Sequence, residues 1–234
     1  ALTGRPVVAH RYLQVTCSFS EPVAGREYVV SVDASLGLER GDESPIQVID
    51  LFTGRHAHEA RLNKPPDLLA YDVAELSDKY NAADIVPERN GPGIALINKL
   101  VELGYENRIY RQLSAEQKRA VEDDRLTFDE ALAKAQLGFL TTGENKGLLG
   151  VELERAIRTG ELGLSSQALI DQLRVCVWAE NGKSWGARSG YHDDLVLALA
   201  IGWFAKRSAA GLARGFVGAL PEFGRTEPEM VTAS

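Results

Sequence analysis

The stretch Tyr28-Val29-Val30-Ser31-Val32 is a mostly apolar run that is followed at once by an acidic residue, Asp33. A run of β-branched and aromatic residues of this length predicts a buried strand. Two further strand-like segments follow at 46–52 and 56–62, and Thr53-Gly54-Arg55 forms the expected turn between them. The spacing therefore predicts an antiparallel meander of three strands.

Helical and strand patterns alternate after the meander. Pro65-Pro66 opens an amphipathic helix, and a short strand is expected at 84–88. Asn90-Gly91-Pro92-Gly93 breaks the chain before a second helix at 94–103, and a helix that is apolar on nearly all sides is expected at 193–206. This order predicts an α/β fold, in which helices cover both faces of a mixed sheet made of the meander and parallel strands.

The composition suits one main domain. The chain has 234 residues, of which 44% are hydrophobic and 25% are charged, as in ordinary globular proteins. Residues 1–26 lack periodicity and are expected to form an N-terminal arm or linker. The main domain is expected at 27–208, and 209–234 is expected to be a poorly ordered C-terminal tail because it is rich in Gly, Ala and Pro.

The charge and the cysteine count exclude several classes of protein. The net charge of -7 and the pI near 5.2 argue against a generally basic protein, although a local basic groove remains compatible with them. Cys17 and Cys176 are the only cysteines, so the sequence indicates neither a zinc site nor a disulfide framework. The longest apolar stretch, 195–205, is too short to cross a bilayer. We therefore expect a soluble intracellular protein without a membrane partner.

Three acidic residues stand at the ends of apolar segments. Asp33 ends the first strand, Glu88 follows Ile85-Val86-Pro87, and Asp194 begins the apolar helix. Carboxylates that are brought together repel one another and lose solvation, so such a group needs cations to remain charged. Oxygen ligands of this kind suit Mg²⁺ or Mn²⁺. The positions predict a metal site, with capping of the helix as the alternative role for Asp193 and Asp194.

Four motifs resemble the C-terminal nuclease domain of the large terminase subunit of tailed bacteriophages. The motifs are Val-Asp-Ala-Ser at 32–35, Val-Pro-Glu-Arg-Asn-Gly-Pro-Gly at 86–93, Gly-Phe-Leu-Thr-Thr at 138–142 with Asn145-Lys146, and Tyr-His-Asp-Asp-Leu-Val-Leu-Ala-Leu-Ala at 191–200. The resemblance covers nearly all of 27–208. It implies a ribonuclease H-like fold and a nuclease that cuts concatemeric viral DNA in the host cytoplasm during genome packaging.

The resemblance also implies a set of site residues and partners. Asp33, Glu88 and Asp194 fall on its catalytic metal-binding positions, with Asp193 as an adjacent candidate ligand for two Mg²⁺ or Mn²⁺ ions. The substrate would be double-stranded DNA. In the intact protein, the implied partners are an ATPase motor domain, the portal ring and the small terminase subunit. The motor's phosphate loop is absent, because 143–147 lacks its glycine spacing and the Ser or Thr after the lysine.

Basic residues and a hairpin are candidates for contact with DNA. Lys146 matches the family pattern for a phosphate contact, whereas Arg89, Lys183 and Arg188 are candidates because they would neutralise phosphates. Asn181-Gly182 predicts a hairpin, for which the resemblance implies a role in DNA access. The histidines carry weaker signals: His192 is expected to face solvent or assist a ligand, and His56 and His58 are expected on the surface.

Two other functions stay open at this point. A nuclease that resolves Holliday junctions would use the same scaffold, and it would prefer four-way junctions to linear duplex. A domain without catalytic activity that docks on DNA or on the portal is the alternative from another class, and the three acids argue against it. Nothing resembles a base-reading helix or a zinc finger, so we expect little sequence specificity.

Overall fold

The computed structural model describes residues 14–38, 41–180 and 182–213. At its centre lies a five-stranded sheet of order β1-β4-β3-β2-β5. Its strands β2, β3 and β4 form the expected antiparallel meander, β5 runs parallel to β2, and β1 adds an antiparallel edge strand. The strands are β1 (Gln14–Ser18), β2 (Tyr28–Val32), β3 (Ser44–Asp50), β4 (Arg55–Leu62) and β5 (Asp84–Pro87).

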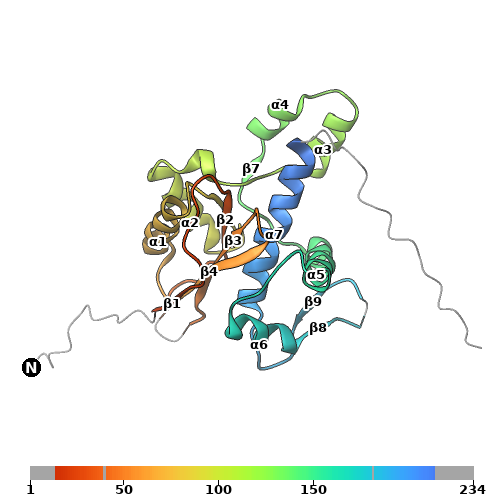
Figure 1. Cartoon of the computed structure of the whole chain (residues 1–234). Helices are drawn as coiled ribbons and strands as arrows, with labels where there is room; N and C mark the ends of the chain where they lie inside the picture. The colour runs from red at the N-terminus through yellow and green to blue at the C-terminus, as the bar shows by residue number, and fades with distance from the viewer. Residues whose placement is uncertain (1–13, 39–40, 181, 214–234) are drawn as a thin grey trace, which may run out of the picture.

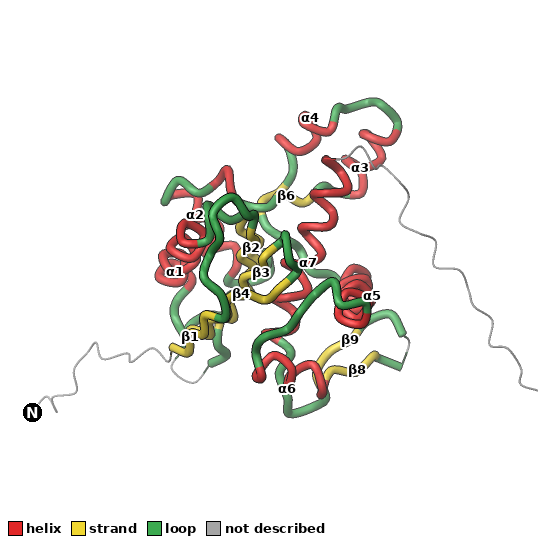
Figure 2. The backbone as a smooth tube through the Cα atoms, viewed as in Figure 1, coloured by secondary structure: helices red, strands yellow, loops and turns green. Residues whose placement is uncertain are grey.

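Helices cover both faces of the sheet, as Figures 1 and 2 show. The helices α1 (Pro66–Lys79) and α2 (Gly93–Glu102) pack on one face, and α7 (Asp194–Ala213) crosses the other. Alternate residues of β2 face the two layers: Val30 and Val32 join the core beneath α1 and α2, whereas Val29 joins the core beneath α7. Because the side-chain period of a strand is two, the central strands are buried on both sides.

The helix α7 lies unusually close to β2. A Cβ atom added to Gly202 would stand 2.5 Å from the Ser31 hydroxyl oxygen and 2.8 Å from its Cβ. Only the missing side chain of glycine permits this approach. Ser31 therefore faces α7, and the next residue of β2 with the same orientation is Asp33.

A second group of elements packs around α7. The helices α5 (Gly143–Arg158) and α6 (Gln167–Val175) contact α7, and the hairpin of β8 (Cys176–Trp178) and β9 (Trp185–Ala187) contacts both of them. The helices α3 (Ala115–Glu122) and α4 (Phe128–Ala133) form a small lobe with its own core of Leu113, Ala131 and Ala135. This lobe projects from the body in Figure 1. Short segments frame it, namely η1 (Glu106–Arg108), β6 (Arg111–Gln112) and β7 (Gln136–Leu137).

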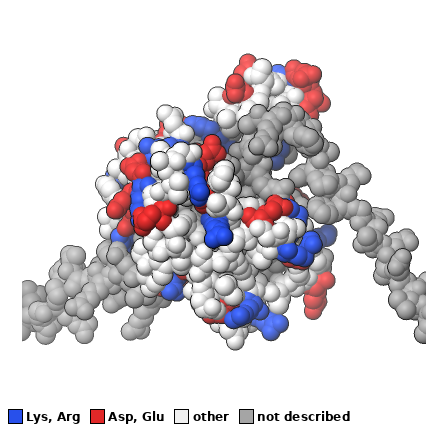
Figure 3. Space-filling model, viewed as in Figure 1, with Lys and Arg blue, Asp and Glu red and all other residues white. Residues whose placement is uncertain are grey.

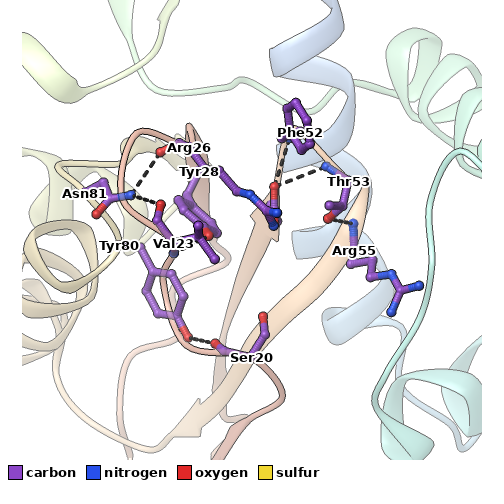
Figure 4. A network of polar contacts seen from close by, with 10 residues as sticks. Ser20, Val23, Arg26, Tyr28, Phe52, Thr53, Arg55, Tyr80 and Asn81 are labelled. Carbon is purple, nitrogen blue, oxygen red and sulfur yellow. Dashed lines mark hydrogen bonds and ion pairs between the residues drawn. The ribbon is translucent and has the colours of Figure 1, made fainter.

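Side chains tie the segment before β2 to the rest of the sheet, as Figure 4 shows. The Asn81 side-chain amide donates to the carbonyl oxygens of Val23 and Arg26, at 2.8 and 3.0 Å. The Tyr80 hydroxyl donates to the Ser20 carbonyl at 3.0 Å. These contacts join the chain between β1 and β2 to the end of α1.

Several boundaries differ from the sequence-based expectations. The strand β1 lies inside the segment 1–26, where an arm was expected, because its pairing with β4 is a tertiary contact that local periodicity does not reveal. The helix α7 continues to Ala213, five residues into the expected tail, and 214–234 lie outside the described residues. The hairpin prediction is confirmed by the pairing of β8 with β9, although Asn181 itself is not described.

Within the described part of the chain, no helix combines the length and the apolar character that crossing a membrane would require.

Candidate metal centre

Asp33 and Glu88 follow two neighbouring parallel strands. The register pairs Val32 of β2 with Pro87 of β5, so the next residues along each strand are Asp33 and Glu88. The backbone remains paired beyond the strand ends, since the Glu88 N–H donates to the Val32 carbonyl at 2.8 Å and the Asp33 N–H donates to the Pro45 carbonyl at 3.2 Å. By strand alternation, both carboxylates lie on the α7 side of the sheet.

Glu88 is fixed by the loop that follows it. Its side chain is 7% exposed, and its Oε1 accepts a hydrogen bond of 3.0 Å from the Asn90 amide. The Asn90 amide also donates to the Thr141 carbonyl at 3.2 Å. A Cβ atom added to Gly93 would stand 1.8 Å from the Glu88 carbonyl oxygen, so the loop closes tightly on the backbone of this residue. The Asn-Gly-Pro-Gly sequence therefore shapes the surroundings of Glu88 as well as starting α2.

The start of α7 supplies two more acids. Asp193 lies just before the helix, and its Oδ2 is 3.0 Å from the Lys146 ammonium nitrogen. Asp194 is the first residue of the helix, and its Oδ2 lies 3.6 Å from Nδ1 of His192, which is exposed. We call Asp33, Glu88, Asp193 and Asp194 the acid cluster. Its members come from β2, β5 and α7, three elements that are distant in sequence.

Electrostatic interactions link Asp33 to the other three members of the acid cluster. Burial raises the pKa of Asp33 to about 9, and the negative charge of Glu88, a hydrogen bond with Glu88 and the charges of Asp194 and Asp193 add to the effect. Burial also raises the pKa of Asp194, and the charges of Asp193 and Asp42 act in the same direction. The positive charges of His192 and Lys146 oppose this rise. With a pKa of about 9, the Asp33 carboxyl holds a proton at neutral pH unless a cation replaces it.

The donors fit a divalent cation by their chemistry. They are carboxylate oxygens, the ligands that Mg²⁺ and Mn²⁺ prefer, and their mutual repulsion is the force that a cation would relieve. Among the described residues, no three His, Cys, Asp or Glu side chains are already arranged around one ion. Asp33 is hydrogen-bonded to Glu88, and Asp193 is paired with Lys146.

Trp185 of the hairpin makes two contacts with Lys146. Its ammonium lies 5.0 Å from the centre of the Trp185 ring, and the Trp185 indole N–H donates to the Lys146 carbonyl at 2.6 Å. Gly186 lies against the same pair, because a Cβ there would stand 3.4 Å from Oδ2 of Asp193. The part of Trp185 in positioning Lys146 was not predicted from the sequence.

The other basic candidates come from the loop after β5 and from the hairpin. The Arg89 guanidinium donates to the Gln136 side chain of β7. Lys183 and Arg188 are exposed and lie before and after β9. Among the basic residues predicted to contact DNA, Lys146 forms an ion pair with the acid cluster, through Asp193.

The expectation that His56 and His58 lie on the surface is wrong. They are 1% and 3% exposed, and burial lowers the pKa of each to about 4. Aromatic side chains pack against them, since the Phe19 ring centre lies 4.9 Å from that of His56 and the Tyr80 ring centre lies 5.9 Å from that of His58. Both histidines belong to the interior of the sheet.

The comparisons with known proteins agree with this architecture. No family model matches the sequence. The crystal structure of the large terminase nuclease from the thermophilic phage G20c matches with a TM-score of 0.58 and 18% identity, over 81% of this chain and 87% of that one. Its magnesium-bound form matches with a TM-score of 0.59 and the same identity, over 81% of this chain and 86% of that one.

The large terminase nuclease domain of the Thermus phage P74-26 matches with a TM-score of 0.53 and 18% identity, over 80% of this chain and 84% of that one. This chain has the fold of the large terminase nucleases. The ribonuclease H-like mixed sheet expected from the motifs is thereby confirmed. Within this terminase nuclease fold, the acid cluster lies where the ends of β2 and β5 meet the start of α7.

Proposed function

We propose that this chain is a metal-dependent endonuclease that cleaves double-stranded viral DNA during genome packaging, with little sequence specificity. The observation that carries the proposal is the convergence of four carboxylates from three elements, where burial and then the charges of the other three acids raise the pKa of Asp33 to about 9. Maintaining such a cluster in a fold costs stability, and perturbed carboxylates of this kind gather at functional sites. The likeness to nucleases that include a magnesium-bound structure supports the same assignment.

Within this proposal, Asp33, Glu88 and Asp194 are the principal ligands of two Mg²⁺ or Mn²⁺ ions. Such ions would supply an activated water for attack on the phosphodiester and stabilise the departing oxygen. The chain fixes the ligands through the β2–β5 register, the Asn90 bond to Glu88 and the start of α7. Asp193 is the secondary candidate, because Lys146 already neutralises it.

The DNA contacts belong to the same proposal. Lys146, Arg89, Lys183 and Arg188 would neutralise phosphates beside the acid cluster. On the face shown in Figure 3, basic side chains lie among acidic ones, and no broad patch of one sign marks a path for DNA. Individual residues of α5, of the hairpin and of the loop after β5 therefore carry this part of the proposal. In the packaging machine, the partners would be the ATPase motor domain, the portal ring and the small terminase subunit.

A nicking assay tests the proposal. Supercoiled plasmid is incubated with the protein and Mn²⁺ or Mg²⁺, and with a chelator as the control for metal dependence. We expect nicking by the wild type and no detectable nicking by Asp33→Asn, Glu88→Gln or Asp194→Asn. Asp129→Asn is the matched control, because it changes an exposed aspartate of α4. Nicking by the Asp33 and Asp194 variants at the wild-type rate would refute the proposal.

The choice of substrate tests the assignment to linear duplex DNA. Cleavage of a labelled duplex is compared with cleavage of a four-way junction of the same arm sequences. We expect comparable rates, and a strong preference for the junction would identify a resolvase instead. A wild type that binds duplex yet cuts neither substrate with either metal would indicate a docking domain.

A further inference from the structure

The residue that follows Asp194 is held by side chains from two other elements. The Leu195 N–H donates to Oε1 of Gln172 in α6 at 3.0 Å, and the Gln47 amide of β3 reaches the Leu195 carbonyl at 3.5 Å. The first N–H groups of a helix have no partner within the helix, so Gln172 satisfies a donor that α7 cannot satisfy itself. The two glutamines therefore contact both peptide groups of Leu195.

This contact bears directly on the orientation of Asp194. The Leu195 N–H belongs to the peptide group that leaves the Cα atom of Asp194, and the plane of that group is rigid. Holding its N–H in place restricts rotation of the Asp194 backbone, and the backbone orientation sets the direction of the Cα–Cβ bond from which the carboxylate extends. A substitution of Gln172 would therefore alter the orientation of Asp194 through Leu195, without a direct contact between Gln172 and an acid.

Gln47 occupies a buried position, where an apolar side chain would cost less folding free energy. It is 0% exposed, and its register partners are Ser31 on β2 and Glu59 on β4. Its amide also donates to Glu59 at 3.3 Å, while its Oε1 has no partner among the described residues. Burying a polar group with an unsatisfied atom lowers stability. Proteins retain such groups mainly where function requires them.

We infer that Gln172, supported by Gln47, is a positioning residue that sets the direction of the Asp194 carboxylate for metal binding. The inference rests on the proposed function, because it assigns Asp194 to the metal. Gln172 acts from α6 and touches neither substrate nor ion. Partners of this kind, one contact away from a metal ligand, change metal affinity by about 10- to 100-fold when they are removed.

The test measures Mn²⁺ binding by the protein without DNA, together with plasmid nicking as a function of Mn²⁺ concentration. We expect Gln172→Met to weaken Mn²⁺ binding by about tenfold or more. The Mn²⁺ concentration for half-maximal nicking should rise by the same factor, while the rate at saturating Mn²⁺ stays close to that of the wild type. Gln172→Glu keeps an oxygen acceptor for the Leu195 N–H, so it should retain Mn²⁺ affinity.

Two further variants separate positioning from simple stabilisation of the fold. Ser166→Ala removes the cap of α6, in which Ser166 Oγ accepts from the Leu169 N–H at 3.2 Å, and it should lower the melting temperature without changing Mn²⁺ affinity. Gln47→Met should weaken Mn²⁺ binding even if it stabilises the fold. Wild-type Mn²⁺ affinity in Gln172→Met would overturn the inference. Absence of Mn²⁺ binding in the wild type itself would instead overturn the proposed function.

Discussion

The ammonium nitrogen of Lys146 lies 3.0 Å from Oδ2 of Asp193, so α5 already supplies a cation to the acid cluster. The pair is partly buried, with 24% and 21% of the two side chains exposed, and the Trp185 ring lies beside it. Lys146 also opposes the rise in the pKa of Asp194. The lysine predicted to contact phosphate therefore has a second effect, which is to keep the neighbouring acids ionised.

The variant Lys146→Met tests this electrostatic effect. Without the ammonium, the pKa of Asp194 should rise further, so more of this carboxyl is protonated at mildly acidic pH. We expect the variant to slow nicking more at mildly acidic than at mildly alkaline pH, by up to roughly tenfold for each pKa unit gained. The measurement is the pH profile of initial nicking rates, with Lys134→Met, an exposed lysine beside α4, as the control. A loss that is equal at every pH would contradict this effect.

Asp33→Asn should stabilise the protein when divalent metal is absent. The raised pKa means that the folded state binds a proton more tightly than the unfolded state, so this stabilising contribution is complete below the ordinary pKa of 3.8 and is lost as the pH rises through about 9. Near pH 8, Asp33 is still mostly protonated in the folded state but ionised in the unfolded state, so the variant avoids the cost of this protonation and should melt about 3–6 °C higher. Thermal unfolding in chelator measures the shift.

Thermal unfolding of the wild type and of Asp33→Asn is also measured with added Mn²⁺. Mn²⁺ should raise the melting temperature of the wild type, because a ligand of the folded state stabilises it, and it should do so much less for Asp33→Asn. A wild type that is more stable than the variant in chelator at alkaline pH would show that the carboxylates do not repel in the folded protein.

Gly93→Ala should disable nicking although residue 93 carries no chemical group. The new methyl would overlap the Glu88 carbonyl oxygen, which lies 1.8 Å from the ideal Cβ position. Relief of this overlap moves Glu88 and costs ~1–3 kcal/mol of stability. Displacement of a ligand by even 1 Å can reduce the rate on the order of 100-fold. Gly143→Ala is the matched control, because its Cβ would meet no atom within 4 Å.

Lys183→Gln and Arg188→Gln should weaken binding of duplex DNA regardless of its sequence. Each phosphate contact that is lost should reduce the slope of log affinity against log salt concentration by about 0.9. Fluorescence anisotropy with a labelled duplex over a range of salt concentrations measures this slope. Arg174→Gln is the control, because this exposed arginine of α6 is paired with Asp171. An unchanged slope in both variants would remove these residues from the DNA contact.

The sequence predicted the helices and strands that have a recognisable local pattern of apolar residues. The positions of Asp33 and Glu88 at strand ends were predicted because each follows an apolar run, and the start of α7 was predicted because the helix behind it is apolar on nearly all sides. The edge strand β1 was missed because a short polar-rich strand has no distinctive periodicity. His56 and His58 were misplaced because alternation along a strand does not reveal how many layers cover it.

The contacts around the acid cluster could not be predicted in the same way. Gln172 and Gln47 are ordinary polar residues in a helix and a strand, and their importance comes from a tertiary contact with Leu195. The pairing of Lys146 with Asp193 joins residues 47 positions apart. Such contacts depend on how layers pack, and no local pattern encodes this packing.

The contact between Gly202 and Ser31 limits which substitutions this protein can tolerate during evolution. Gly202 is eight residues along α7 from Asp194, about 12 Å at the rise of an α-helix, and Ser31 is two residues before Asp33. A larger residue at position 202 would move α7 away from β2 and so increase the distance between Asp194 and Asp33. Tolerance to mutation should therefore be low in the middle of the helix as well as at the cluster, and substitutions there would abolish activity while leaving every ligand intact.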